Sequence, residues 1–247
     1  MYVHKICNRV LTVLMCILNF LLVWTKNLTF FPRPTFTKTQ MIIQELLENE
    51  KRYVAALEVG IKTYIGPFTT IALPKTLVGK RFIIFSNIVQ IFEFHNEKFL
   101  PKLLECGFDP EKIADTFTTC IERCQFDNYI VYVHNKTKSQ QICKENKYFF
   151  MQLDQDLLGI NSFLLQPIQR LPRYQLLISE LVKELFKDFT KNKNAISRCC
   201  IAEKNIYNLL TIVNEQCEWM ETSRFLVGNE KMYKIESWKE GTGKDPI

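Results

Sequence analysis

The feature that most constrains the fold is a long helical pattern in residues 161–186, NSFLLQPIQRLPRYQLLISELVKELF. Its apolar residues are three or four positions apart, which places them on one face of a helix. These apolar residues are Leu164, Ile168, Leu171, Tyr174, Ile178, Leu181 and Leu185. Pro167 and Pro172 lie inside the pattern, and each one removes a backbone donor and bends a helix. The polar residues expected on the other face are Gln166, Gln169, Arg170 and Arg173. A bent helix with such a polar cluster predicts a docking surface for another protein.

Most of the remaining chain carries the same spacing of three and four residues. The spacing predicts helices over residues 41–65, 82–104, 111–134, 139–153 and 192–219. We therefore predict an all-α protein, an elongated helical bundle. The predicted organisation is a hydrophobic segment with a proline-containing linker in residues 1–38, a helical domain in 39–224 and a short polar tail in 225–247.

Composition excludes several classes of function. The formal net charge is +6, but no block of five or more like charges occurs, so the sequence does not indicate a nucleic-acid partner. The nine cysteines form no C-x-x-C pair, and the three histidines lie far apart in the sequence. Together with the absence of a glycine-rich phosphate loop, this pattern predicts neither a metal nor a cofactor. Scattered single cysteines are typical of a reducing compartment.

Residues 10–24 are fifteen consecutive uncharged residues, preceded by Lys5 and Arg9. The run is shorter than the roughly 17–25 residues of a membrane-spanning helix. No clear small-x-small cleavage site follows it, as a signal peptide would require. A membrane-associating segment and an unstructured leader both remain open. The expected location is the cytoplasm, with membrane association through residues 10–24 left open.

Glu50 interrupts an apolar series on the first predicted helix. The series is spaced by seven residues and consists of Ile43, Glu50, Leu57 and Tyr64. Burial of an unpaired carboxylate costs several kcal/mol. We therefore expect Glu50 either at the edge of the apolar stripe or facing a partner. An ion pair with a residue four positions away, or simple solvation, is the alternative.

Four segments, in order along the chain, resemble the signature blocks of Dbl-homology domains, the exchange-factor domains that act on Rho-family GTPases. Residues 44–57 (QELLENEKRYVAAL) resemble the first block, and residues 85–100 resemble the segment after it. Residues 126–135 (FDNYIVYVHN) resemble the second block, and residues 161–181 the third. The resemblance covers roughly residues 40–222, and residues 130–140 look most like the branch that contains Trio, kalirin and puratrophin.

The resemblance implies a guanine-nucleotide exchange factor for a Rho-family small GTPase. Such a protein makes or breaks no covalent bond, so an enzyme in that sense is not expected. Glu50 matches the acidic residue that in this family reaches the first switch loop of the GTPase. Gln166 and one of the two arginines would brace the second loop, although either arginine could instead pair within the bundle. The residues expected to bind the GTPase are Glu50, Gln166, Arg170, Arg173, Tyr207 and Asn208.

Two positions depart from the family pattern. Gln166 stands where many members have a lysine, and Tyr207 stands where many have a short polar residue. These departures favour an alternative function, a Dbl-homology-like scaffold that binds GTPases or other signalling proteins without catalysing exchange. Residues 225–247 are also too few for the pleckstrin-homology domain that usually follows. The chain is expected to be a fragment, an incomplete product or a Dbl-homology domain alone.

Overall fold

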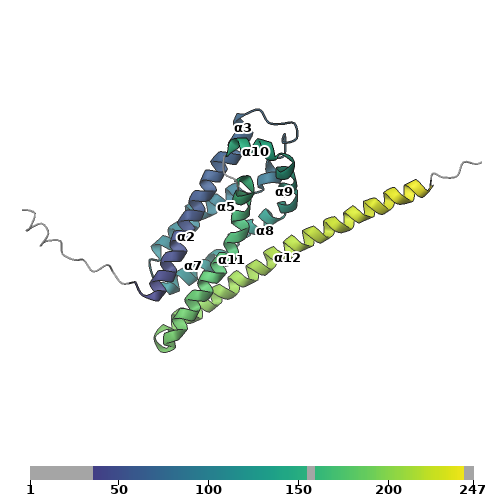
Figure 1. Ribbon diagram of the computed structural model, residues 1–247. Coiled ribbons are helices and arrows are strands. Elements are labelled where there is room, and N and C mark those ends of the chain that lie inside the picture. Colours follow the sequence, from purple (N-terminus) through teal and green to yellow (C-terminus); the bar gives the residue numbers. More distant parts are fainter. Residues whose placement is uncertain (1–35, 155–158, 242–247) are drawn as a thin grey trace, which may run out of the picture. The chain divides into compact units, whose positions relative to one another are not determined.

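A computed structural model describes residues 36–154 and 159–241, with side chains as far as residue 216. The chain divides into two compact units, Met1–Thr37 and Lys38–Ile247, and the second is the unit described below. Every regular element in the described ranges is a helix (Figure 1). The prediction of an all-α bundle is confirmed.

The helices carry the labels of Figure 1. In chain order they are α2 (Lys38–Gly60), the π-helical η1 (Ile61–Ile65), α3 (Pro67–Thr70), α4 (Arg81–Phe85), α5 (Ile88–Phe94), the π-helical η2 (His95–Phe99), α6 (Leu100–Glu105), α7 (Pro110–Glu122), α8 (Asn128–Val133), α9 (Lys136–Glu145), α10 (Lys147–Leu153), α11 (Gly159–Leu185), the 3₁₀-helical η3 (Phe186–Asp188) and α12 (Phe189–Gly241).

The long helix α11 joins the halves of the bundle, because it packs against both α2 and α12 (Figure 1). Helix α7 in turn packs against α12. The apolar stripe predicted for α11 is buried, except that Ile168 is only partly buried. Tyr174 of this stripe and the nearby Leu177 are both buried. Pro167 and Pro172 lie within α11, and the helix continues through them. Periodicity therefore located the central helix and its core face.

Two predicted helices are broken by turns with a positive φ, and a third, residues 139–153, is divided between α9 and α10 at Asn146. Residues 111–134 form α7 and α8, separated by a turn in which Cys124 has a φ of 55°. Phe126 lies in this turn, and its side chain is buried in the core, where it is 1% exposed. Residues 82–104 are broken at Ser86, whose φ is 48°, and the Asn87 amide beside it donates to the carbonyl of Asn128. Apolar residues continue across both turns, so their spacing did not reveal the breaks.

The π-helical turn η2 determines where His95 lies. The N–H of Leu100 donates to the carbonyl of His95, five residues earlier, which is the hydrogen bond that defines a π-helix. His95 and Phe99, at the two ends of this turn, are both completely buried. The wider turn thus brings a polar ring into an aromatic core.

No helix of the described residues is long and apolar enough to cross a bilayer. Residues 10–24, for which membrane association was left open, lie outside the described residues. At the other end, α12 continues to Gly241, so much of the predicted polar tail belongs to a helix.

Candidate functional site

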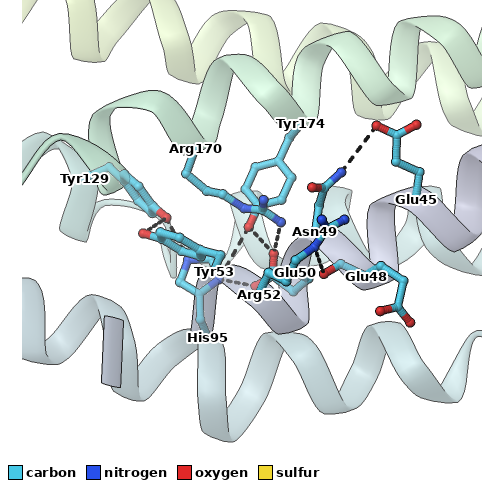
Figure 2. Close-up of polar contacts among 10 residues, drawn as sticks. All are labelled: Glu45, Glu48, Asn49, Glu50, Arg52, Tyr53, His95, Tyr129, Arg170 and Tyr174. Atoms are coloured by element: carbon cyan, nitrogen blue, oxygen red, sulfur yellow. Dashed lines mark hydrogen bonds and ion pairs between the residues drawn. The ribbon is translucent and has the colours of Figure 1, made fainter. Parts of the chain in front are cut away.

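A buried cluster of charged and polar side chains surrounds the Glu50 carboxylate (Figure 2). Glu50 is completely buried, as are Ile43 and Leu57 of the same apolar series. Its Oε1 lies 2.6 Å from Nδ1 of His95. Its Oε2 accepts hydrogen bonds from Nη2 of Arg170 and, at 2.6 Å, from the hydroxyl of Tyr174. Both carboxylate oxygens therefore have partners from other helices, and these interactions offset the desolvation cost of burying the charge.

Arg170 reaches this cluster from α11 and is only 4% exposed. Its guanidinium carbon lies 5.0 Å from the ring centroid of Tyr53 and 4.3 Å from that of Tyr174. A cation over aromatic faces is attracted by the ring quadrupoles. Nε of Arg170 is the part of the guanidinium that is buried without a hydrogen-bond partner. The counter-charge and the two rings explain why an arginine predicted on the polar face of α11 is instead buried.

His95 extends the cluster to α8. Its Nδ1 donates to the Glu50 carboxylate, because an ionised carboxylate can only accept. Its Nε2 lies 2.8 Å from the hydroxyl of Tyr129, and this hydroxyl lies 3.1 Å from that of Tyr53. The hydrogen-bonded series links α2, η2, α8 and α11, so it fixes the positions of four elements relative to one another.

The electrostatics of the cluster favour the ionised form of Glu50. Burial raises the pKa of Glu50, but the interactions of the carboxylate with His95 and Arg170 and its hydrogen bonds with His95 and Tyr174 lower it by more, so the resulting pKa is about 2 against an ordinary value of 4.5. Burial raises the pKa of Tyr53, Tyr129 and Tyr174 well above the ordinary range. Glu50 is therefore an anion and the three tyrosines are neutral at physiological pH.

These findings correct the sequence interpretation of Glu50 and Arg170. Glu50 is neither at the edge of the stripe nor solvated, and its ion pair is not with a residue four positions away. In this conformation neither Glu50 nor Arg170 offers a surface to a partner. The open alternative, that an arginine pairs within the bundle, is met by Arg170, while Arg173 is exposed. The two charges do lie together, as the sequence interpretation required.

The other predicted residues lie nearer the surface. Tyr207 is 58% exposed on α12, and Asn208 beside it is exposed too. Gln166 is partly buried, and its Oε1 has no hydrogen-bond partner. It lies on a groove of about 330 Å³ between α2 and α11. The residues of α2 that line this groove are small or short: Ala55, Ala56, Val59 and Gly60. These predicted residues remain candidates for contact with a partner.

The exposed part of α2 carries a second acid that the sequence interpretation did not single out. Glu45 lies five residues before Glu50 in the same segment and is exposed. The amide of Asn49, itself 8% exposed, lies 3.4 Å from Oε1 of Glu45 and orients it (Figure 2). The sequence does contain a signal for this acid. Glu45 does not belong to the apolar series that contains Glu50, so its position indicates a side chain outside the core.

His95, Tyr53 and Tyr129 were also missed as members of a polar cluster. Tyr53 and Tyr129 lie in segments that resemble the signature blocks, and His95 belongs to no recognisable motif. The cluster brings together residues that are 34 to 124 positions apart in the sequence. No local pattern identifies partners at such separations.

Comparison with known proteins identifies the family. The model of the RhoGEF domain matches residues 42–210. Human Rho guanine nucleotide exchange factor 25 is 31% identical over 182 residues, which are 71% of this chain and 31% of that protein. Human puratrophin-1 is 31% identical over 153 residues, 60% of this chain and 13% of that protein. The chain thus spans about a third or less of the length of these relatives.

Solved structures agree in fold. The Dbl-homology domain of FARP2 has a TM-score of 0.58 and 20% identity, with 81% of this chain and 99% of that chain covered. The DH/PH domains of PDZ-RhoGEF, in complex with GTP-γ-S-activated RhoA, have a TM-score of 0.66 and 19% identity, with 80% and 60% covered. With four ordered signature segments on a matching helical bundle, this chain belongs to the RhoGEF domain family.

Proposed function

We propose that this chain promotes GDP release from a Rho-family small GTPase by stabilising the nucleotide-free form. The observation that carries the proposal is the RhoGEF domain match over residues 42–210. A protein that binds the nucleotide-free GTPase more tightly than the loaded form lowers nucleotide affinity by the same factor, by linkage. Exchange of this kind needs a complementary surface and no covalent step.

The surface proposed for this contact is the α2–α11 face, defined by Glu45, Glu48 and Arg52 of α2 and by Gln169, Arg173 and Leu176 of α11. Five of these residues are exposed, and Glu48 is partly buried. Leu176 is 71% exposed between charged neighbours. A large apolar side chain within a charged rim is typical of a protein-docking surface. Gln166 and the groove beside it continue this face, and Tyr207 and Asn208 supply candidate contacts from α12.

Within this face we assign the acidic contact to Glu45 and the basic contact to Arg173. The first signature segment offers three acids: Glu50 is buried, Glu48 is partly buried and paired with Lys51, and Glu45 is exposed to a partner. A carboxylate can accept hydrogen bonds from backbone and hydroxyl groups of a switch loop. Glu50 and Arg170 act instead as positioning residues, because their cluster holds α2 against α11 beneath the face.

A fluorescent-GDP release assay against a panel of Rho-family GTPases tests the proposal. We expect wild type to accelerate release from at least one member, and Glu45→Ala or Arg173→Ala to slow that release about tenfold, the effect of losing roughly 1.4 kcal/mol. Tyr148→Ala is the matched control, since Tyr148 is 84% exposed on α10. Its release rate should equal that of wild type.

Three outcomes separate the alternatives. Wild-type rates for both Glu45→Ala and Arg173→Ala would show that the α2–α11 face is wrongly assigned. Tight GTPase binding without faster release would support the scaffold function. A panel with neither binding nor release would contradict both.

The proposed activity requires the cytoplasm, where it would meet a GTPase. Association with a membrane through residues 10–24 is a further part of the proposal. Fractionation of the chain with and without residues 1–30 tests it, and an unchanged distribution would contradict it.

A further inference from the structure

The corner between α11 and α12 exposes an aromatic pair that the core does not use. The chain reverses through η3 between Leu185, which is 2% exposed, and Phe189. Phe186 is 50% exposed and Phe189 is 51% exposed. Their rings stack on each other, with centroids 6.1 Å apart and an angle of 19° between the planes. Leu185 already anchors the corner to the core, so the two rings form an apolar surface facing outward.

Lysines surround this aromatic pair. Residues 183–194 contain four lysines, two acidic residues and no arginine. The lysines are Lys183, Lys187, Lys191 and Lys193, and all four are exposed. Both acids are engaged within the corner. Glu184 pairs with Lys187 at 2.6 Å, while Asp188 accepts hydrogen bonds from the hydroxyl of Thr190 and the N–H of Lys191. The corner therefore combines an exposed apolar centre with an excess of positive charge.

We propose that this α11–α12 corner (residues 183–193) is a contact surface for an anionic lipid bilayer. Exposed phenylalanine rings are buried at the boundary between headgroups and acyl chains when a basic surface lies on a membrane. Lysine side chains bury their methylene stems there and extend the ammonium to lipid phosphates. The corner offers both elements together, and a bilayer with negative headgroups complements its charge. The proposal does not depend on exchange activity.

Vesicle co-sedimentation of the full chain tests the corner. Vesicles of phosphatidylcholine with phosphatidylserine are compared with vesicles of phosphatidylcholine alone. We expect the double change Phe186→Ser, Phe189→Ser to lower partitioning to the anionic vesicles about tenfold, and Lys187→Glu, Lys191→Glu to do the same, because stable anchoring requires an apolar and an electrostatic signal. Phe82→Ser is the matched control, since Phe82 is 64% exposed on α4. It should partition like wild type.

A local probe removes any masking by residues 10–24. In Phe189→Trp, we expect the emission in excess of wild type to shift to the blue and to be quenched by brominated lipids in anionic vesicles. Equal partitioning of all variants together with unquenched emission at position 189 would overturn the proposal. So would unchanged partitioning with weaker GTPase binding by the lysine variant, because the corner would then contact a protein.

Discussion

Two pairs of charged residues on the same two helices have opposite environments. Glu50 of α2 and Arg170 of α11 are buried and paired with each other. Glu45 and Arg173 lie on the same helices, five and three residues away, and both are exposed. The difference is one of helical phase, because the five residues from Glu45 to Glu50 turn the helix by about 140°, while the three from Arg170 to Arg173 turn it by about 60°, enough to pass the edge of the buried stripe. The position of a charged residue around the helix axis thus decides whether it stabilises the bundle or is available to a partner.

The largest expected effect comes from removal of one partner of the buried pair. Arg170→Met leaves the Glu50 carboxylate buried without its main counter-charge, which should lower the free energy of unfolding by about 3–5 kcal/mol. Urea denaturation measures the change. Arg173→Met is the matched control on the same helix and should change stability by less than about 0.5 kcal/mol. Equal losses in the free energy of unfolding for the two variants would contradict a special role of the buried pair.

A pH dependence should follow from the same pair. The pKa of Glu50 in the folded chain is about 2, below its ordinary value of 4.5. The stability that this group contributes is therefore complete above about pH 5 and is lost as pH falls toward 2, by at most about 3 kcal/mol. Denaturant unfolding from pH 7 to pH 3 measures it. Glu50→Gln should be less stable at pH 7 but should have a flatter profile below pH 5. Parallel profiles would contradict the role assigned to Glu50.

Close packing between α2 and α11 predicts a smaller effect. A Cβ added at Gly60 would lie 2.1 Å from Cδ2 of Phe163, and Phe163 is only 3% exposed. We expect Gly60→Ala to destabilise the chain by about 1–3 kcal/mol, despite the better helix propensity of alanine, because the ring has little room to move. Thermal unfolding measures the loss. Ala55→Ser, at an exposed position of the same helix, should have little effect, and a stabilised Gly60→Ala would show that Phe163 relaxes freely.

The smallest predicted effect shows whether Tyr129 contributes to the stability of the buried cluster. Tyr129→Phe removes a hydroxyl that contacts both His95 and Tyr53. We expect a loss of about 1 kcal/mol in the free energy of unfolding, the usual contribution of one hydrogen bond. Tyr148→Phe at an exposed position is the control. If the two variants are equally stable, the cluster ends at His95.

The sequence predicted the larger features well. The spacing of α11 gave the buried stripe, and the ordered segments gave the family. It failed at the turns near Ser86 and Cys124, where apolar spacing continues although the helix is interrupted. It also failed at Glu50, because the sequence does not show which distant residues stabilise the buried carboxylate.

The sequence by itself determined which segments are helical, which faces are apolar and which family the chain resembles, because helical periodicity and short motifs are local properties. Only the tertiary structure decided which acid and which arginine are buried. His95, Arg170 and Tyr174 are 45, 120 and 124 residues from Glu50, and their approach in the folded bundle makes a buried charge stable there. The same packing left Glu45 and Arg173 in solvent, because no partner of opposite charge or aromatic face covers them in the described part of the bundle.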